Sequence, residues 1–192
     1  MSKLETNQVD PATGTTLTLG TSGDTITIPS GVTIANSGTA TGFGGDNTPY
    51  FYGALASDQA VSRGVDTKIT GMTTGEIDTD SAFDGTTFTV PSGMGGNYFI
   101  SATIQANFDS IGNDGERVRA MIYKNGSIIF RNVYYDQSTD TREVSVNTNA
   151  IVALSASDTI ELYVSARDAD SGNPVISSDQ KGTNIFGYKL IG

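Results

Sequence analysis

The chain of 192 residues contains neither cysteine nor histidine. Without cysteine there can be no disulfide, no thiolate zinc site and no thiol nucleophile. Without histidine the chain lacks the usual general base near neutral pH and the commonest ligand of transition metals. A histidine-dependent catalytic triad is excluded for the same reason. Any catalysis would have to use carboxylates, lysine or tyrosine, and we predict that the protein is not an enzyme.

Basic residues are also few, with 11 Lys and Arg against 21 Asp and Glu and a net charge of -10. Such a surface does not attract nucleic acid or an anionic membrane, and we expect neither as a partner. No stretch approaches the roughly 18–20 apolar residues of a membrane helix. The segment from Met1 to Asn7 has no apolar core of a signal peptide, so we expect synthesis in a host bacterial cytoplasm without classical secretion.

Residues 1–48 differ in composition from the rest, with twelve threonines, eight glycines and a single aromatic residue, Phe43. Three short bursts alternate apolar residues with threonine, and their apolar members are Leu17, Leu19, Ile26, Ile28, Val32 and Ile34. Alternation with a period of two places such residues on one face of a strand. Strands this short cannot bury that face within one chain, so we predict an extended β stalk or anchor that docks on partner chains. A flexible threonine-rich linker is the alternative, and residues 38–45 have linker composition.

From Pro49 onward, β-branched and aromatic bursts alternate with turn residues about every 10–15 positions, which is typical of a sandwich or jelly roll. We predict strands at 51–56, 67–70, 86–90, 97–107, 117–124, 128–135, 142–152, 159–166 and 182–191. The Asn125–Gly126 pair predicts a tight hairpin turn, because both residues tolerate a positive φ. No window forms a convincing amphipathic helix. The predicted class is all-β, with an N-terminal segment at 1–48 and a head at 49–192.

Two kinds of side chain are candidates for ligand binding. Acidic residues gather in predicted loops, and Asp109, Asp114 and Glu116 are the candidates for calcium. The simpler interpretation is that these acids lie in solvated turns, so no cofactor is predicted. Tyr134 and Tyr135 are candidate receptor contacts, because exposed tyrosine rings can stack on sugars, although core or interface packing explains most such rings.

Five short motifs follow one another at strand-sized spacing. They are Phe88–Pro91, Gly96–Phe99, Lys124–Gly126, Leu154–Asp158 and Ile185–Tyr188. Together they resemble the jelly-roll heads of the complement-1q and tumour-necrosis-factor superfamily, over about residues 49–192. Two positions depart from the family pattern: Ser157 stands where the family prefers glycine, and Ile185 stands at a phenylalanine position.

The resemblance implies a homotrimer and a binding module rather than an enzyme. In this family the first strand returns to lie beside the last, and aromatic residues of both are buried around the three-fold axis. The interface residues implied here are Tyr50, Phe51, Tyr52, Phe186, Gly187 and Tyr188. We expect Gly187 to allow the close approach of a neighbouring strand or subunit, since a glycine inside a strand packs nothing itself.

A threonine- and glycine-rich segment before such a head resembles the fibre and capsid-decorating proteins of tailed bacteriophages, as does the stretch from Gly23 to Val32. Our hypothesis is a trimeric structural protein on the virion surface. Residues 1–48 would attach to a capsid or tail protein, and the head would contact a host-surface glycan or protein. One alternative is a free bacterial glycan- or protein-binding module of the same fold. Another is a carboxylate-based glycoside hydrolase, which would need paired acids about 5–10 Å apart in a cleft.

Overall fold

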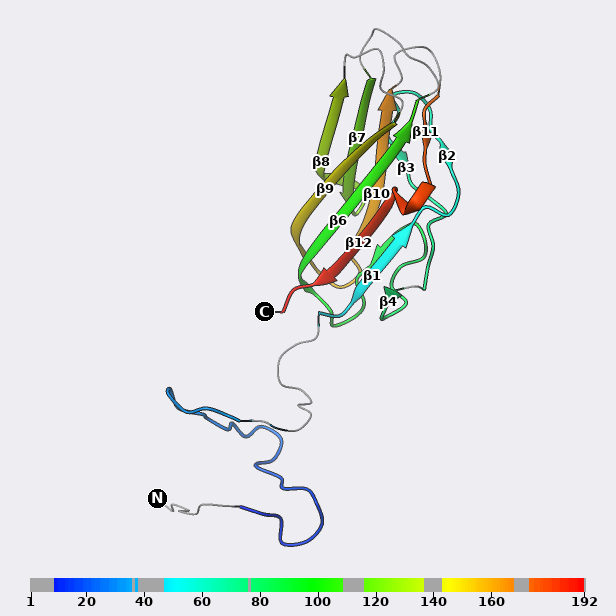
Figure 1. Cartoon of the computed structure of the whole chain (residues 1–192). Coiled ribbons are helices and arrows are strands. Elements are labelled where there is room, and N and C mark those ends of the chain that lie inside the picture. Colours follow the sequence, from blue (N-terminus) through cyan, green and yellow to red (C-terminus); the bar gives the residue numbers. More distant parts are fainter. Residues whose placement is uncertain are drawn as a thin grey trace. The chain divides into compact units, whose positions relative to one another are not determined.

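The computed structural model describes residues 9–35, 37, 47–75, 77–108, 116–136, 143–167 and 173–191. The chain divides into two units, Met1–Thr41 and Gly42–Gly192, which are drawn in Figure 1 and are treated separately below. The predicted linker at residues 38–45 lies outside the described residues. The predicted boundary after residue 48 stays a prediction.

The described part of the second unit is built from strands, as predicted. The elements are β1 (Tyr50–Ala54), β2 (Gln59–Ala60), β3 (Thr67–Lys68), β4 (Ile77–Asp78), β5 (Thr87–Thr89), β6 (Gly96–Asn107), β7 (Glu116–Lys124), β8 (Ser127–Asp136), β9 (Glu143–Leu154), β10 (Thr159–Arg167), β11 (Val175–Ile176), the 3-10 helix η1 (Asp179–Lys181) and β12 (Asn184–Lys189). Among the described residues no helix is long and apolar enough to cross a membrane. The all-β class is confirmed, and each of the nine predicted strands has a counterpart.

The strands form two antiparallel sheets (Figure 1). In the first sheet the order is β9–β6–β12–β1–β4, and β6 also pairs with β11, which in turn pairs with β2. In the second sheet the order is β8–β7–β10, and both β3 and β5 pair with β10. β5, β7, β8 and β10 belong to the second sheet, whereas β6, β9 and β12 belong to the first. The chain therefore crosses repeatedly between the two layers, as in a jelly roll.

The first and last long strands of the head lie side by side, as the family resemblance implied. β1 pairs with β12 along its whole length, with Phe51 opposite Gly187. This pairing brings residues that are far apart in the sequence to the middle of the first sheet. It creates the surface from which the candidate site is built.

The core lies between the two sheets and follows the predicted alternation. On β6 the predicted inward set is fully buried; it consists of Tyr98, Ile100, Ala102, Ile104 and Ala106. On β10 the inward residues Ile160, Leu162 and Val164 are equally buried. The rings of Phe51 and Phe88 stack across the core with centroids 4.3 Å apart. Burial of each such large apolar side chain contributes about 1.5–3 kcal/mol, which holds the two layers together.

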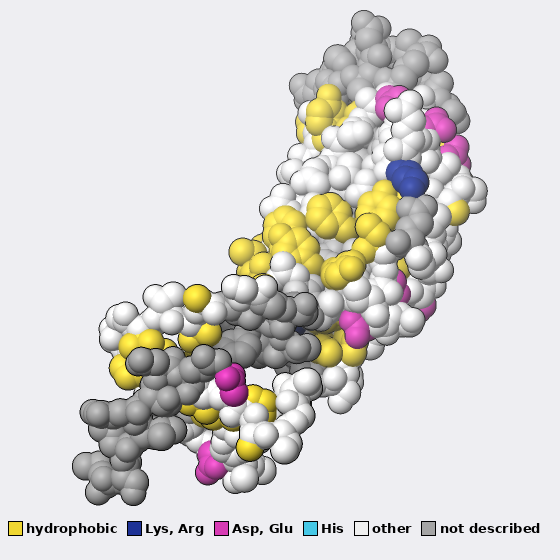
Figure 2. Space-filling view, turned by 60° about the horizontal axis from the view of Figure 1, so that its bottom comes forward, with side chains coloured by type: hydrophobic (Ala, Val, Ile, Leu, Met, Phe, Trp, Pro, Cys, Tyr) yellow, Lys and Arg dark blue, Asp and Glu magenta, His cyan; other side chains and the backbone are white. Residues whose placement is uncertain are grey.

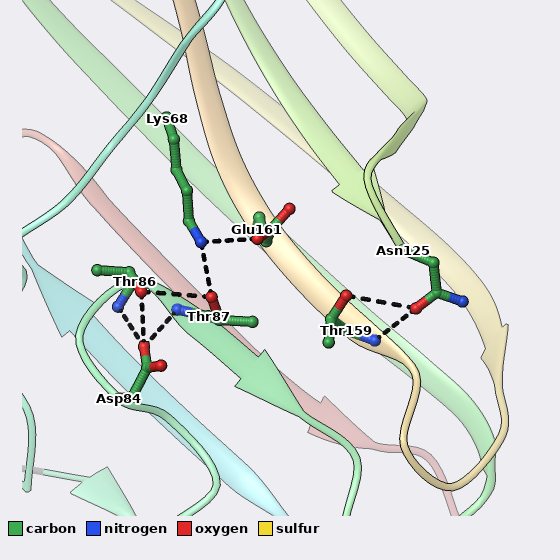
Figure 3. Close-up of polar contacts among 7 residues, drawn as sticks. All are labelled: Lys68, Asp84, Thr86, Thr87, Asn125, Thr159 and Glu161. Carbon is green, nitrogen blue, oxygen red and sulfur yellow. Dashed lines mark hydrogen bonds and ion pairs between the residues drawn. The ribbon is translucent and has the colours of Figure 1, made fainter.

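The β7–β8 hairpin turns at Asn125 and Gly126, which have φ values of 51° and 75°. Positive φ at both central residues is the conformation of a type I′ turn, so the prediction from Asn-Gly is confirmed. The turn is tied to the start of β10, since the backbone N–H of Thr159 donates to Asn125 Oδ1 at 2.8 Å (Figure 3). The neighbouring turn has Ser157 at φ 70°. That conformation explains why glycine is preferred in the family at this position.

In the first unit, residues 9–35 contain no strand. The three apolar bursts are exposed instead of sharing a buried face. Their exposed fractions run from 44% to 62% for Leu17, Leu19, Ile26, Ile28, Val32 and Ile34. The expectation of β structure here is corrected for the single chain, because no described strand pairs with these bursts. Only local turns form, such as the bond from the Asp24 N–H to the Thr21 carbonyl at 3.0 Å.

Candidate functional site

An aromatic row crosses the outer face of the first sheet. Tyr50 lies opposite Tyr188, Tyr188 lies opposite Phe99, and Phe99 lies opposite Ile151. Residues directly opposite one another on antiparallel strands project from the same face. The row therefore runs over β1, β12, β6 and β9 and gathers segments of the chain that are about a hundred residues apart.

A second row lies beside the first, where Ile77 on β4 is opposite Tyr52 and Tyr52 is opposite Phe186. We call the two rows together the aromatic face; it consists of Tyr50, Tyr52, Ile77, Phe99, Ile151, Phe186 and Tyr188. The Phe99 ring lies with its centroid 5.5 Å from that of Tyr188 and 6.3 Å from that of Phe186, the range of attractive aromatic pairs.

The aromatic face is open to solvent in the single chain. Tyr50 is 40% exposed, Ile77 47% and Ile151 63%. The four remaining rings are half-buried by one another. Figure 2 shows hydrophobic side chains gathered in a band over this side of the head. The band contains a hollow of about 390 Å³ that is lined by six of the residues from β1 and β12.

Further along the same sheet the outer face becomes polar. Thr103 on β6 lies opposite Asn147 on β9, and the Asn147 amide donates to Thr103 Oγ1 at 3.1 Å. Asn149 donates to Asn147 Oδ1 at 3.1 Å. These bonds order the polar end without involving a charged group. The face therefore has an aromatic end and an amide-rich end, which together form an amphipathic contact surface.

Two of the six predicted interface residues are corrected by the structure. Phe51 is 2% exposed, and its ring stacks on Phe83 and Phe88 in the core. Gly187 is buried on the same inward face, where an added Cβ would lie 2.5 Å from Ile100 Cδ1 and 2.9 Å from Phe51 Cε1. The chain's own core therefore requires the glycine. Alternate residues of a strand project to opposite sides, so a run of three neighbours could not all face a partner.

The other four predicted interface residues, Tyr50, Tyr52, Phe186 and Tyr188, do lie together on the aromatic face. Their role in an interface stays a prediction. The sequence analysis missed Phe99 and Ile151, which complete the row. A signal for Phe99 was present, because it follows the inward residue Tyr98, but its neighbours on other strands depend on register.

A second apolar surface lies on β8, at the edge of the second sheet. We call it the β8 edge; it consists of Ile128, Phe130, Val133, Tyr134 and Tyr135, with exposed fractions from 37% to 59%. The two candidate receptor contacts are both on this strand but project to opposite sides. Tyr134 lies opposite the buried Val118, whereas Tyr135 lies opposite Arg117 on the outer face. No receptor contact is tested by this geometry.

The candidate metal ligands are not brought together in the described structure. Asp109 and Asp114 lie outside the described residues, and Glu116 opens β7. Among the described residues no group of three or more acidic side chains could hold a metal ion. Calcium binding at the three candidates stays untested.

Acidic side chains in the described loops stabilise their own turns. Asp84 Oδ1 accepts hydrogen bonds from the backbone N–H groups of Thr86 at 2.8 Å and Thr87 at 2.7 Å (Figure 3). Burial alone would raise the pKa of the Asp84 carboxyl, but the hydrogen bonds of Thr86 and Thr87 outweigh burial and lower the pKa. Asp78 accepts similar bonds from Ala82 and Phe83. These acids are occupied by structural bonds.

The carboxylate of Glu161 is also occupied, because Lys68 Nζ lies 2.6 Å from its Oε1 atom. The same ammonium group donates to Thr87 Oγ1 at 2.7 Å, which links β3, β5 and β10 (Figure 3). A glycoside hydrolase needs one carboxyl to protonate a leaving group and another that faces it across a cleft. Neither Glu161 nor Asp84 is arranged in that way.

Comparison with known proteins identifies the fold. No model of a known protein family matches the chain, and no match is found among curated protein sequences. Among solved structures, the chain is similar to the Eiger tumour necrosis factor of S. frugiperda, with 15% identity over 73% of this chain and 90% of that one, at a TM-score of 0.53. This similarity confirms the jelly-roll fold of the tumour-necrosis-factor type that the sequence motifs predicted.

Proposed function

We propose that the chain is the subunit of a trimeric structural protein of a tailed bacteriophage, with the head displayed on the virion surface for adhesion to the host. The observation that carries this proposal is the aromatic face, which exposes five rings and two aliphatic side chains on the outer side of one sheet. Exposed apolar patches of this kind mark surfaces that become covered in an assembly.

The aromatic face and the β8 edge are different surfaces of one chain, on different sheets. When one surface of a subunit packs on a different surface of the next, the contact is head-to-tail and a rotation can close it into a ring. A ring of three agrees with the trimers of the family that the head resembles. In such a ring each β8 edge would cover the aromatic face of its neighbour, and most of the exposed large apolar side chains of the head would become buried.

The N-terminal unit supports attachment to a particle. Its six exposed Leu, Ile and Val side chains have no apolar layer to cover them in the described chain. Docking on a capsid or tail protein would bury them and favour the alternating strands that the single chain does not form. Three weak sites on each trimer and many trimers on each particle would raise avidity without tight single-site binding.

Sedimentation of the purified chain tests the trimer. We expect a species of three times the chain mass of 20.0 kDa. Tyr188→Asp should dissociate it, because the substitution places a charge at the centre of the aromatic face. Val65→Asp is the matched control, since Val65 is 54% exposed in a loop outside both apolar surfaces. A wild-type monomer at all concentrations would overturn the proposal.

Incorporation into particles tests the attachment. Particles assembled with a chain that lacks residues 1–41 should carry no head, while the truncated protein remains trimeric in solution. If the truncated chain is still incorporated, the anchor lies elsewhere. If the full-length trimer does not associate with particles at all, the alternative of a free bacterial binding module is favoured.

A further inference from the structure

Arginine is concentrated on one surface of this acidic protein. The chain has six arginines and a net charge of -10. Four of the six lie on the outer face of the second sheet; they are Arg117, Arg119, Arg131 and Arg167 on β7, β8 and β10. A general excess of acid cannot account for this arrangement, so the local geometry is informative.

The pairing of the strands places three of these arginines side by side. Arg167 on β10 lies opposite Arg117 on β7, and Arg117 lies opposite Tyr135 on β8. Arg119 is the next outward residue along β7 and lies opposite Ser165. Because neighbouring strands are about 4.8 Å apart, three guanidinium side chains arise from adjacent positions with an exposed tyrosine beside them.

Within the described part of the chain, no ion pair neutralises Arg117, Arg119 or Arg167. The pKa of the Arg117 guanidinium is lowered, first by burial and then by repulsion from the charges of Arg119 and Arg167. Asp66 opposes this shift, but its carboxylate also accepts a hydrogen bond from the Tyr123 hydroxyl at 3.2 Å. The cluster therefore holds an excess of positive charge that costs folding energy.

Two buried polar atoms lie in the same place without a hydrogen-bond partner. One is Nε of Arg117, and the other is Oγ of Ser165, a residue that is fully buried next to Arg167 and opposite Arg119. Buried polar groups are nearly always satisfied in folded proteins, so exceptions call for a functional or structural reason. Like charges and unpaired donors at one position are the features that a bound anion would satisfy.

We propose that Arg117, Arg119, Arg167 and Tyr135 form a binding site for an acidic saccharide. The planar guanidinium groups would hold the carboxylate, sulfate or phosphate of the sugar through paired N–H donors. Tyr135, which is 59% exposed, would stack on the sugar ring. The inference rests on the proposed adhesive role of the head and gives it a ligand class. The net negative charge of the protein would restrict binding to ligands that reach the cluster directly.

Calorimetric titration of the full-length protein tests the site with defined probes. These are a hyaluronan oligosaccharide for carboxylate, a heparin oligosaccharide for sulfate and a glycerol phosphate oligomer for phosphate, with dextran as the neutral control. We expect at least one acidic probe to bind, dextran not to bind, and affinity to fall as salt increases. If none of the acidic probes binds at low salt, the proposal is overturned.

Variants then locate the binding. Arg119→Gln and Arg167→Gln should each weaken the acidic probe about tenfold or more, because each removes a charge-assisted hydrogen bond. Arg167→Lys should recover only part of the affinity, because lysine cannot donate a planar pair of bonds. Lys189→Gln on the first sheet makes the same change in net charge and should alter affinity less than about twofold. Equal losses in Lys189→Gln and Arg167→Gln would show a diffuse charge effect and overturn the site.

Thermal melting provides a second readout that does not depend on a ligand. Arg167→Gln should raise Tm, because it removes repulsion within the cluster, while Lys189→Gln should not. Sedimentation of the same samples separates this inference from the proposed function. A trimer that binds no acidic probe would remove the site and leave the assembly intact, whereas a monomer that binds would do the reverse.

Discussion

The two units of this protein contain the same kind of local pattern and use it differently. In the N-terminal unit Ile26 and Ile28 flank a threonine and are 58% and 46% exposed. In the head Ile160 and Leu162 flank a glutamate in the same way and are fully buried. Alternation decides which side chains share a face. A second layer is needed to bury that face, and within the described chain only the head supplies one.

Gly187→Val is the strongest test of the layer that the head supplies. Valine at this position would bring its Cβ into Ile100 and Phe51 in the core, so we expect the head to lose about 3 kcal/mol of unfolding free energy or not to fold. Denaturant unfolding of the head measures the loss. Asn184→Val on the outward side of the same strand is the control and should cost much less. A fully stable Gly187→Val protein would show that the inner face of β12 is wrongly assigned.

Acid should also distinguish the two units. Asp158 accepts hydrogen bonds from the Asn125 side chain, the Ser155 N–H and Lys124, and its pKa is lowered from 3.8 to about 2. Because the pKa in the folded state is below that of the unfolded chain, the stabilisation is complete above pH 4 and is lost as the pH falls towards 2. Asp158→Asn should therefore flatten the melting temperature of the head over this range.

Asp24 is the matched carboxyl in the N-terminal unit. Its pKa is also lowered by hydrogen bonds from the Thr21 backbone and hydroxyl, but the turn that it closes belongs to the other unit. Asp24→Asn should leave the acid melting of the head unchanged. A change as large as that of Asp158→Asn would mean that the two units unfold together.

Ser157→Gly should stabilise the head slightly. Ser157 has φ 70°, a conformation that costs a residue with a side chain about 1 kcal/mol more than glycine, partly offset by the greater chain entropy of glycine. We expect a gain of about 0.5 kcal/mol and a rise in Tm of about 1–2 °C. Ser155→Gly is the control and should be destabilising, since Ser155 is not at a positive φ.

Removal of residues 1–41 should have the smallest effect on the head. The six apolar side chains of that segment are exposed, so little buried surface is lost with them. We expect the Tm of the head to stay within about 1 °C of the full-length value. A drop of several degrees would show that the segment packs on the head and would remove the contrast between the two units.

The long strands could be predicted from sequence because each carries its own alternation over several residues. β2, β4 and β11 could not, since each has only two residues and exists because a neighbouring strand offers hydrogen bonds. The N-terminal bursts failed in the opposite way. Their alternation is clear, but the described chain contains no partner that would convert it into a sheet.

The candidate sites were only partly predictable for a related reason. Tyr50, Tyr52, Phe186 and Tyr188 could be named from the family resemblance, but the same argument also included Phe51 and Gly187, which lie in the core. The row of Arg117, Arg167 and Tyr135 was not predicted at all, although Tyr135 itself was a candidate. Nothing in the sequence near any one of these residues indicates which residue lies opposite it.

The sequence by itself determined the all-β class, the long strands, the Asn125–Gly126 turn and the chemistry that the absence of cysteine and histidine excludes. These features depend on composition and on patterns within a few residues. The tertiary structure decided which side of each strand faces the core and which residues align across strands, as Tyr50, Tyr188, Phe99 and Ile151 do. Both depend on register, which is selected by hydrogen bonding and packing between distant segments once the two layers close on each other.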